Sequence, residues 1–217
     1  MVGNNEIFKG WEHGLEKTIR KSGTQFKESK MILGICGSGR KEGNTGALVE
    51  EVLKAAGTES ELVWLIDINL GYCTGCWRCV SEGKCWQEDG MTDLYKKMIN
   101  CDAMVIGSPC YYGEVSGLVK SMMDRSIALG YMGIGKESDT SMHGRKPLAD
   151  KPAAVLSAVA GHGVEGALKT MEKFVKYGEM NFVGKLGAIA GMGDVRENDD
   201  IMSEARALGM KIKEALK

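Results

Sequence analysis

The 217-residue sequence has little proline, little histidine and no excess of either charge. It contains 3 Pro and 3 His, and its 28 Lys and Arg are balanced by 29 Asp and Glu, for a formal net charge of -1. Nucleic-acid binding is built on a clear basic excess, so we expect no nucleic-acid partner. The histidines are too scattered to form a metal site: they are His13, His143 and His162.

Long hydrophobic runs are also missing. No segment approaches the ~18 apolar residues of a membrane span, and residues 1–30 lack the apolar stretch of roughly 7 to 15 residues in a secretory signal. We therefore expect a cytoplasmic protein with no membrane partner. Thiols stay reduced in that compartment, so the 7 Cys are expected to bind metal or do chemistry rather than form disulfides.

What is present, from residue 31 onward, is an alternation of short apolar runs and helical patterns. The runs are nearly continuous, as in strands buried on both faces of a parallel sheet, and they cover 31–36, 62–66, 103–106, 153–159 and 186–190. The helical patterns cover 45–56, 91–100, 115–129, 164–178 and 199–216. This order predicts an α/β fold: a three-layer sandwich around a doubly wound, five-stranded parallel sheet.

Two segments lie outside this alternation. Residues 1–30 are predicted to be an N-terminal helical extension, because Ile7, Trp11 and Leu15 fall on one helical face. That face packs either on residues 31–217, the single predicted domain, or on a partner subunit. The polar segment 130–151 is expected to be a flap or a subunit contact.

A glycine-rich loop, Gly-Ser-Gly-Arg-Lys-Glu-Gly-Asn-Thr (37–45), joins the first predicted strand to a helix. Its glycines let the backbone approach a ligand, Ser38 and Thr45 offer hydroxyls, and Arg40 offers charge. The helix N-terminus adds free N–H groups, so the loop suits a phosphate. It has neither the Gly-Lys-Ser/Thr ending of a P-loop nor the Gly-x-Gly-x-x-Gly dinucleotide pattern. The alternative is a plain turn in which Asn44 caps the helix.

A second loop, Gly-Ser-Pro-Cys-Tyr-Tyr-Gly-Glu (107–114), follows the third predicted strand. Ligands of doubly wound sheets bind at the carboxyl ends of the strands, so this loop is expected to face the phosphate loop. Its aromatic side chains and backbone could form a wall for a flat conjugated ring. The alternative is that the tyrosines only cap the sheet.

Four cysteines follow the second predicted strand in the pattern C-x2-C-x2-C-x5-C: Cys73, Cys76, Cys79 and Cys85. A [4Fe-4S] cluster takes four cysteine ligands, and successive x2 spacings are typical of it. Structural zinc usually uses two separated C-x2-C pairs, which fits less well, and a loop without metal is a third possibility. Trp77 and Trp86 either shield a cluster from water or pack the loop.

Three sets of residues carry a resemblance to a known family: Gly37-Ser38-x-Arg40-x-x-Gly43-Asn44-Thr45; Gly107-Ser108-Pro109-x-Tyr111-x-Gly113; and Lys120 with Asp124-Arg125. They resemble the NADPH-dependent FMN reductase-like branch of flavodoxin-like proteins over roughly residues 31–190. Within that branch the cysteine-rich insert, residues 71–90, is similar to that of the iron-sulfur flavoproteins. The resemblance implies a flavodoxin-like fold and an FMN cofactor.

The resemblance also implies which residues bind each cofactor. For FMN they are Ser38, Arg40, Asn44, Thr45, Gly46, Pro109, Cys110, Tyr111, Tyr112, Gly113 and Gly161. For a [4Fe-4S] cluster they are Cys73, Cys76, Cys79 and Cys85. Relatives often carry an aliphatic residue at the position of Cys110, so a thiol there is a departure. Cys36 and Cys101 adjoin predicted strands and are interpreted as inert core residues.

The function expected from this resemblance is electron transfer. An FMN-dependent oxidoreductase with a [4Fe-4S] cluster would pass electrons between ferredoxin or NAD(P)H and an acceptor such as quinone, O2 or peroxide. The cofactors would do the redox chemistry, so no side chain is assigned as general acid or base. The resemblance implies a homodimer or homotetramer. The alternatives are a cluster-free NAD(P)H-dependent FMN or quinone reductase and a non-enzymatic redox or zinc sensor.

Overall fold

The computed structural model describes residues 30–131 and 146–217. The predicted N-terminal helix and most of the segment 130–151 therefore lie outside the described residues. Among the helices that are described, none is both long and apolar enough to cross a membrane.

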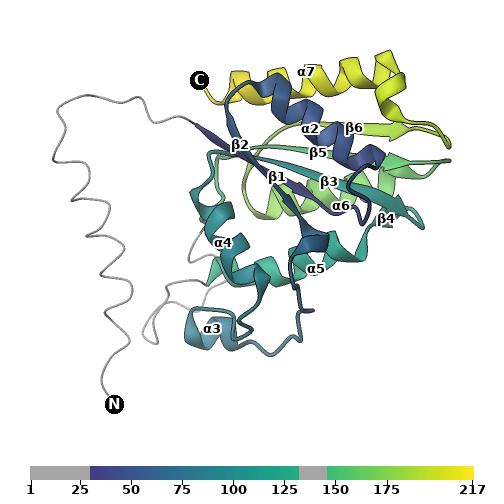
Figure 1. Ribbon diagram of the computed structural model, residues 1–217. Coiled ribbons are helices and arrows are strands. Elements are labelled where there is room, and N and C mark those ends of the chain that lie inside the picture. The colour runs from purple at the N-terminus through teal and green to yellow at the C-terminus, as the bar shows by residue number, and fades with distance from the viewer. Residues whose placement is uncertain (1–29, 132–145) are drawn as a thin grey trace.

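Five parallel strands form the central sheet, in the order β2-β1-β3-β5-β6 (Figure 1). They are β1 (Met31–Cys36), β2 (Glu59–Trp64), β3 (Ala103–Tyr111), β5 (Pro152–Val159) and β6 (Asn181–Ile189). This is the flavodoxin-like order, in which the winding direction reverses between β1 and β3. The predicted parallel sheet is confirmed, with one addition: the two-residue β4 (Glu114–Val115) pairs antiparallel with the end of β3.

Helices cover both faces of the sheet, which confirms the three-layer sandwich (Figure 1). One layer holds α2 (Asn44–Ala56) and α7 (Asp199–Ala215). The other layer holds α4 (Gly90–Asn100), α5 (Gly117–Arg125) and α6 (Val164–Tyr177). Shorter elements connect them: η1 (Leu65–Asp67), α3 (Arg78–Glu82), η2 (Ser126–Gly130) and η3 (Val195–Glu197).

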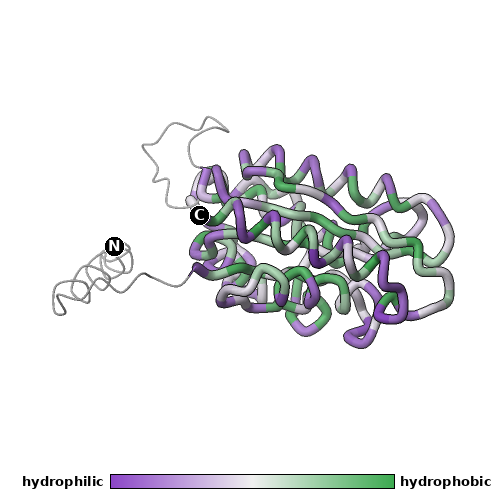
Figure 2. The backbone as a smooth tube through the Cα atoms, turned by 90° about the horizontal axis from the view of Figure 1, so that it is seen from above, coloured by the Kyte–Doolittle hydropathy of each residue, from purple (hydrophilic) through white to green (hydrophobic). Residues whose placement is uncertain are grey.

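Two hydrophobic clusters, one on each face of the sheet, make up the core. Successive strand residues point to opposite faces, so Ile32 joins the cluster under α2 and α7 while Leu33 joins the one under α4, α5 and α6. Val105 and Met104 divide in the same way. The inner strands β1 and β5 are therefore almost wholly buried, whereas hydrophilic and hydrophobic residues alternate along the helices, as the purple and green bands of Figure 2 show.

The observed bounds differ from the predicted ones in β3 and in both edge strands. The third strand runs through 103–111 rather than 103–106, so residues 107–111, which were predicted as loop, continue the strand. The two edge strands differ as well. The second strand is β2 at 59–64 rather than 62–66, and the last is β6 at 181–189 rather than 186–190. Each of these strands has one neighbouring strand and carries exposed polar residues in the part that was missed. The predicted helix 115–129 is instead α5 (117–125) followed by the 3-10 turn η2 (126–130).

Candidate functional site

The glycine-rich loop after β1 is shaped by its own hydrogen bonds. The Ser38 hydroxyl accepts from the Arg40 N–H at 3.1 Å and donates to the Arg40 carbonyl at 3.0 Å. The Gly37 N–H donates to the Gly107 carbonyl at 2.9 Å and so ties the start of this loop to the middle of β3. Helix α2 starts after Gly43, which has no side chain to cap it. The first-turn N–H groups thus have no side-chain acceptor, as an anion site requires.

Asn44 is not the helix cap. Its amide nitrogen donates to the Gly193 carbonyl at 3.0 Å, and its amide oxygen accepts from the Val195 N–H at 3.1 Å. The plain-turn interpretation with Asn44 as N-cap is therefore wrong, because that position belongs to Gly43. The Asn44 side chain instead joins the loop after β6 to the loop after β1. The sequence does not reveal this pairing, because the partners lie 149 and 151 positions away.

The next two predicted FMN contacts, Thr45 and Gly46, lie in the first turn of α2 and are buried. A Cβ atom at Gly46 would lie 2.2 Å from Cη2 of Trp64, so a glycine here lets the end of β2 pack on the helix. Their contacts with FMN remain a prediction.

The loop after β3 is a tight hairpin. Its two central residues, Tyr112 and Gly113, have φ of 52° and 78°, the left-handed pair of a type I′ turn. Such a conformation is uncommon for tyrosine and marks a strained position. The side chain of Tyr112 is fully exposed and that of Tyr111 is 56% exposed, whereas Pro109 and Cys110 are buried. Two exposed aromatic rings thus stand where the sequence predicted a wall for a flat ligand.

Ser116, which sequence reasoning missed, ties the hairpin to the glycine-rich loop. Its hydroxyl donates to the Gly37 carbonyl at 2.8 Å and caps α5 by accepting from the Val119 N–H. Its N–H donates to the Ser108 hydroxyl at 2.9 Å. The available signal was a serine directly before a helix. It was overlooked because the helix was predicted to start at 115.

The loop after β5 closes the same edge from the other side. The Cys110 thiol donates to the Gly163 carbonyl at 3.3 Å, and burial raises the pKa of this thiol. The hairpin also lies against α6: a Cβ at Gly166 would be 2.0 Å from the Gly113 carbonyl oxygen. Gly161 is exposed, with open space around it. The loops after the neighbouring strands β1, β3 and β5 are therefore brought together at one edge.

The cysteine-rich insert forms a second site, away from that edge. A cavity of about 110 Å³ is lined by all four of its thiols: Cys73, Cys76, Cys79 and Cys85. Trp77, Trp86, Gln87 and Arg125 also line it, and none of the described residues contributes a carboxylate or an imidazole to its lining. Within the described residues, no three or more His, Cys, Asp or Glu side chains are grouped so as to hold a metal ion. The all-sulfur donor set nevertheless fits a cluster in its chemistry.

The pKa values of two of the four thiols are shifted, in opposite directions. Burial raises the pKa of Cys79, and charge on Cys85, Cys76 and Cys73 raises it further. The Cys76 pKa is lowered, chiefly by a hydrogen bond from the Arg78 backbone. Thiolates gathered in this way repel one another unless a cation neutralises them.

The insert depends on backbone conformations that are rare for most residues. Trp77, directly before α3, has a φ of 57°, and Gly75 and Gly83 have φ of 63° and 68°. Both tryptophan side chains line the cavity but stay partly exposed, Trp77 at 63% and Trp86 at 44%. The guanidinium of Arg78 lies 5.5 Å from the centre of the Trp86 ring.

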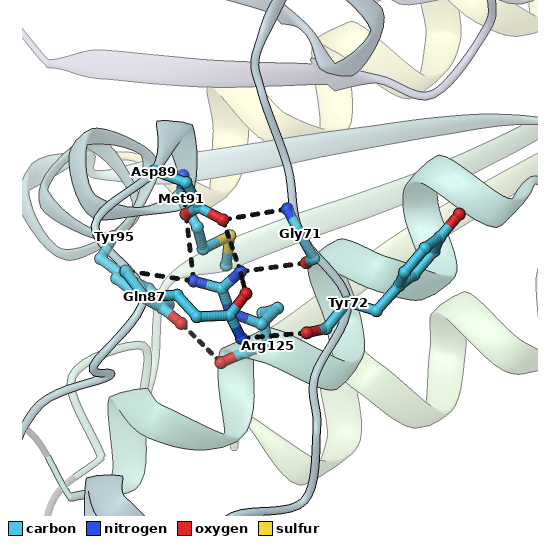
Figure 3. A network of polar contacts seen from close by, with 7 residues as sticks. All are labelled: Gly71, Tyr72, Gln87, Asp89, Met91, Tyr95 and Arg125. Carbon is cyan, nitrogen blue, oxygen red and sulfur yellow. Dashed lines mark hydrogen bonds and ion pairs between the residues drawn. The ribbon is translucent and has the colours of Figure 1, made fainter.

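Arg125 holds the two ends of the insert together (Figure 3). Its guanidinium donates to the Gly71 carbonyl at 3.0 Å, to both Asp89 carboxylate oxygens at 2.7 and 3.0 Å, and to Gln87 Oε1 at 3.3 Å. The Tyr95 hydroxyl donates to the Arg125 carbonyl at 2.7 Å. The side chain of Arg125 is 1% exposed, so this is a buried cation with a buried counter-charge.

The pair with Arg125 changes the ionisation of Asp89. Burial alone would raise the pKa of this carboxyl group, but hydrogen bonds from Arg125, Gly71 and Met91 outweigh burial and lower it. The same carboxylate caps α4 through the Met91 N–H. Sequence reasoning included Arg125 in the family resemblance without its partners, which lie 36 to 54 positions away.

Fold and site together define a flavodoxin-like α/β protein with a glycine-rich helix N-terminus and an aromatic hairpin at the carboxyl edge of its sheet. Residues 31–194 match the family model of NADPH-dependent FMN reductase. An iron-sulfur flavoprotein of Methanocaldococcus jannaschii is 34% identical over 198 residues, which are 86% of this chain and 97% of the relative. Another, of Archaeoglobus fulgidus, is 30% identical over 190 residues, 84% of this chain and 79% of the relative. The chain therefore belongs to the NADPH-dependent FMN reductase family and, within it, to the iron-sulfur flavoproteins.

Solved structures support the fold. A flavone reductase superposes with a TM-score of 0.65 at 20% identity, covering 86% of this chain and 62% of the other. An NADH:FMN oxidoreductase superposes with a TM-score of 0.61 at 16% identity, covering 87% of this chain and 90% of the other. The family assignment supports FMN as the cofactor and an FMN-dependent oxidoreductase as the class of enzyme.

Proposed function

We propose that this protein is an electron-transfer flavoprotein that couples FMN to a [4Fe-4S] cluster. The observation that carries the proposal is the single cavity lined by the four thiols of the insert, in a chain related to iron-sulfur flavoproteins. The cluster ligands are Cys73, Cys76, Cys79 and Cys85. All seven cysteines of the chain are free thiols, as a protein of the reducing cytoplasm requires.

FMN binds at the carboxyl edge of the sheet in this proposal. The first-turn N–H groups of α2, the hydroxyl of Ser38 and the exposed guanidinium of Arg40 hold the phosphate. Ser38 already donates its proton to the Arg40 carbonyl, so phosphate binding requires this hydroxyl to turn. Tyr111 and Tyr112 cover the ring, and Gly113, Gly161, Pro109 and Cys110 bring backbone close to it.

The two cofactors supply complementary chemistry: FMN exchanges electrons in pairs or singly, and a cluster exchanges one at a time. The electron donor in the proposal is ferredoxin or NAD(P)H, and the acceptor is a quinone, O2 or peroxide. The assembly is a homodimer or homotetramer, as the family resemblance implies. The chain's own residues bind, orient and shield the cofactors, and no side chain serves as a general acid or base.

The test is an analysis of iron, sulfide and flavin in protein purified without oxygen, together with its visible spectrum. About four irons and four sulfides per chain, one FMN, and a broad absorption that bleaches with dithionite support the proposal. Cys76→Ala is expected to lose iron and the broad absorption while keeping FMN. Cys36→Ala, which removes a buried sheet thiol away from the insert, is the matched control and is expected to keep both.

Two outcomes would overturn the proposal that the insert binds a [4Fe-4S] cluster. FMN without iron, with rapid bleaching by NADPH or NADH, identifies a cluster-free reductase, which the matched family model favours as the second candidate. One tightly bound zinc without turnover identifies a sensor.

A further inference from the structure

One of the three guanidinium nitrogens of Arg125 takes no part in holding the insert together. Its two terminal nitrogens donate to five acceptors, which are the Gly71 carbonyl, the Gln87 carbonyl and Oε1, and both carboxylate oxygens of Asp89. The third nitrogen, Nε, is fully buried and has no hydrogen-bond partner among the described residues. An unpaired buried donor costs stability unless something else accepts from it.

Arg125 is also one of the residues that line the cavity of the four cysteines. Asp89, which balances its charge, is not among the residues that line that cavity. The residue that carries the positive charge of the pair is thus the one that borders the cavity. Nearby charge on Cys85 also contributes to raising the pKa of Arg125, although burial alone would lower it.

We propose that Arg125 sets the reduction potential of the cluster held by the insert, by placing a buried positive charge beside it. This inference rests on the proposed function. A cluster gains one electron on reduction, so its net charge becomes more negative by one. A nearby cation with little water around it stabilises the reduced form more than the oxidised form and raises the potential. Arg125 is a positioning residue in this role, since no bond to it forms or breaks.

Substitution of Asp89 gives a second test, because it is expected to shift the reduction potential in the direction opposite to substitution of Arg125. Asp89→Asn keeps the shape of the side chain and an oxygen that can accept from Met91 or Gly71, but it removes the counter-charge. Arg125 then acts on the cluster with its full charge. Removing the cation and removing the anion of this ion pair are therefore expected to move the potential in opposite directions. A general loosening of the insert would not make the direction depend on which of the two charges is removed.

The experiment is a dithionite titration of the cluster, without oxygen, in the wild-type protein and four variants. Arg125→Gln is expected to lower the equilibrium constant for reduction at least tenfold, equivalent to 59 mV for a one-electron couple. Arg125→Lys, which keeps the charge, is expected to recover at least half of that shift. Asp89→Asn is expected to raise the potential. Lys84→Gln removes an exposed charge beside Cys85 and is the matched control, expected to shift the equilibrium less than twofold because water screens it.

Each outcome decides the question. Equal potentials in wild type, Arg125→Gln and Asp89→Asn overturn the inference, as does a shift of the same sign in both variants. If the Gln variant does not retain a cluster, Asp89→Asn decides alone: a raised potential supports the role of Arg125, and an unchanged or lowered one overturns it. Absence of iron from the wild-type protein is a different failure, because it overturns the proposed function itself.

Discussion

The flavin edge and the cysteine insert are held in place by different means. At the flavin edge, three loops follow adjacent parallel strands and are joined by short hydrogen bonds, such as that from Gly37 to Gly107 and that from Ser116 to Gly37. The insert leaves the sheet between η1 and α4. Its two ends are joined by direct hydrogen bonds, such as that from the Gly71 N–H to Asp89, and by the buried side chain of Arg125, which bonds both ends. The geometry of the first site follows from the order of the strands, whereas that of the second depends on a small polar network centred on Arg125 and Asp89.

This difference predicts that one substitution should damage the insert far more than any single loop change damages the flavin edge. Arg125→Ala leaves the Asp89 carboxylate largely buried without its cation, which costs about 3–5 kcal/mol. Urea unfolding followed by circular dichroism measures the loss. Arg206→Ala, which breaks an ion pair with Glu51 that is half-exposed on the arginine side, is the matched control and should cost less than about 1 kcal/mol. Equal losses in the two variants would show that Arg125 is no special support.

The two regions also differ in why they need glycine. A Cβ at Gly37 would lie 2.1 Å from Cγ2 of Val119 and 2.9 Å from the Ser116 hydroxyl, so Gly37→Ala forces the loops apart and is expected to cost about 1–3 kcal/mol. Gly39→Ala, two residues along the same loop, meets no atom within 4 Å and should leave the free energy of unfolding unchanged or raise it by up to about 1 kcal/mol.

In the insert the requirement is conformational rather than spatial. Gly75 also has no atom within 4 Å of a Cβ, but its φ is 63°, so Gly75→Ala is expected to cost about 1 kcal/mol. Thermal unfolding of the three variants Gly37→Ala, Gly39→Ala and Gly75→Ala ranks them directly. A harmless Gly37→Ala would mean that the contact between β1 and α5 is looser than the structure has it.

The strands and the order of their loops were predictable because buried parallel strands leave continuous apolar runs, as in β1, whose predicted and observed bounds agree. The edge strand β2 begins three residues before its predicted start, because Glu59 and Glu61 face water and therefore resemble a polar connector in the sequence. Two features were beyond the sequence. The hairpin pairing of Tyr111 with Glu114 spans too few residues to leave a periodic pattern. The contacts of Arg125 join segments that only the finished fold brings together.

Acid should weaken the insert before it weakens the flavin edge. The pKa of Asp89 is lower in the folded protein than its ordinary value of about 3.9, so its contribution to stability is complete above that pH and is lost as the pH falls through the folded pKa. Urea unfolding at several pH values compares wild type with Asp89→Asn, which cannot titrate. The stability advantage of the wild type is expected to shrink as the pH falls below about 4. A constant advantage down to pH 3 would contradict the assigned pair.

The smallest expected effect concerns the tip of the flavin hairpin. Tyr112 has a φ of 52° in a type I′ turn, where Asn before Gly is preferred, so Tyr112→Asn should raise the free energy of unfolding by roughly 0.5 kcal/mol. The same change removes an exposed ring proposed to cover FMN and should weaken FMN binding roughly twofold to tenfold, the range expected for one aromatic contact. Fluorescence titration with FMN and thermal unfolding measure the two effects.

Tyr177→Asn provides the control for that prediction, since it removes another highly exposed tyrosine, at the end of α6, and should leave FMN binding unchanged. A gain in stability together with weaker FMN binding, confined to Tyr112, would mean that the strained turn is kept for its ligand. The flavin edge then resembles the insert after all, because both contain a residue whose placement costs stability that only a bound cofactor recovers. If FMN binding is instead unchanged in Tyr112→Asn, the strain has no ligand to explain it, and the contrast between the two regions stands.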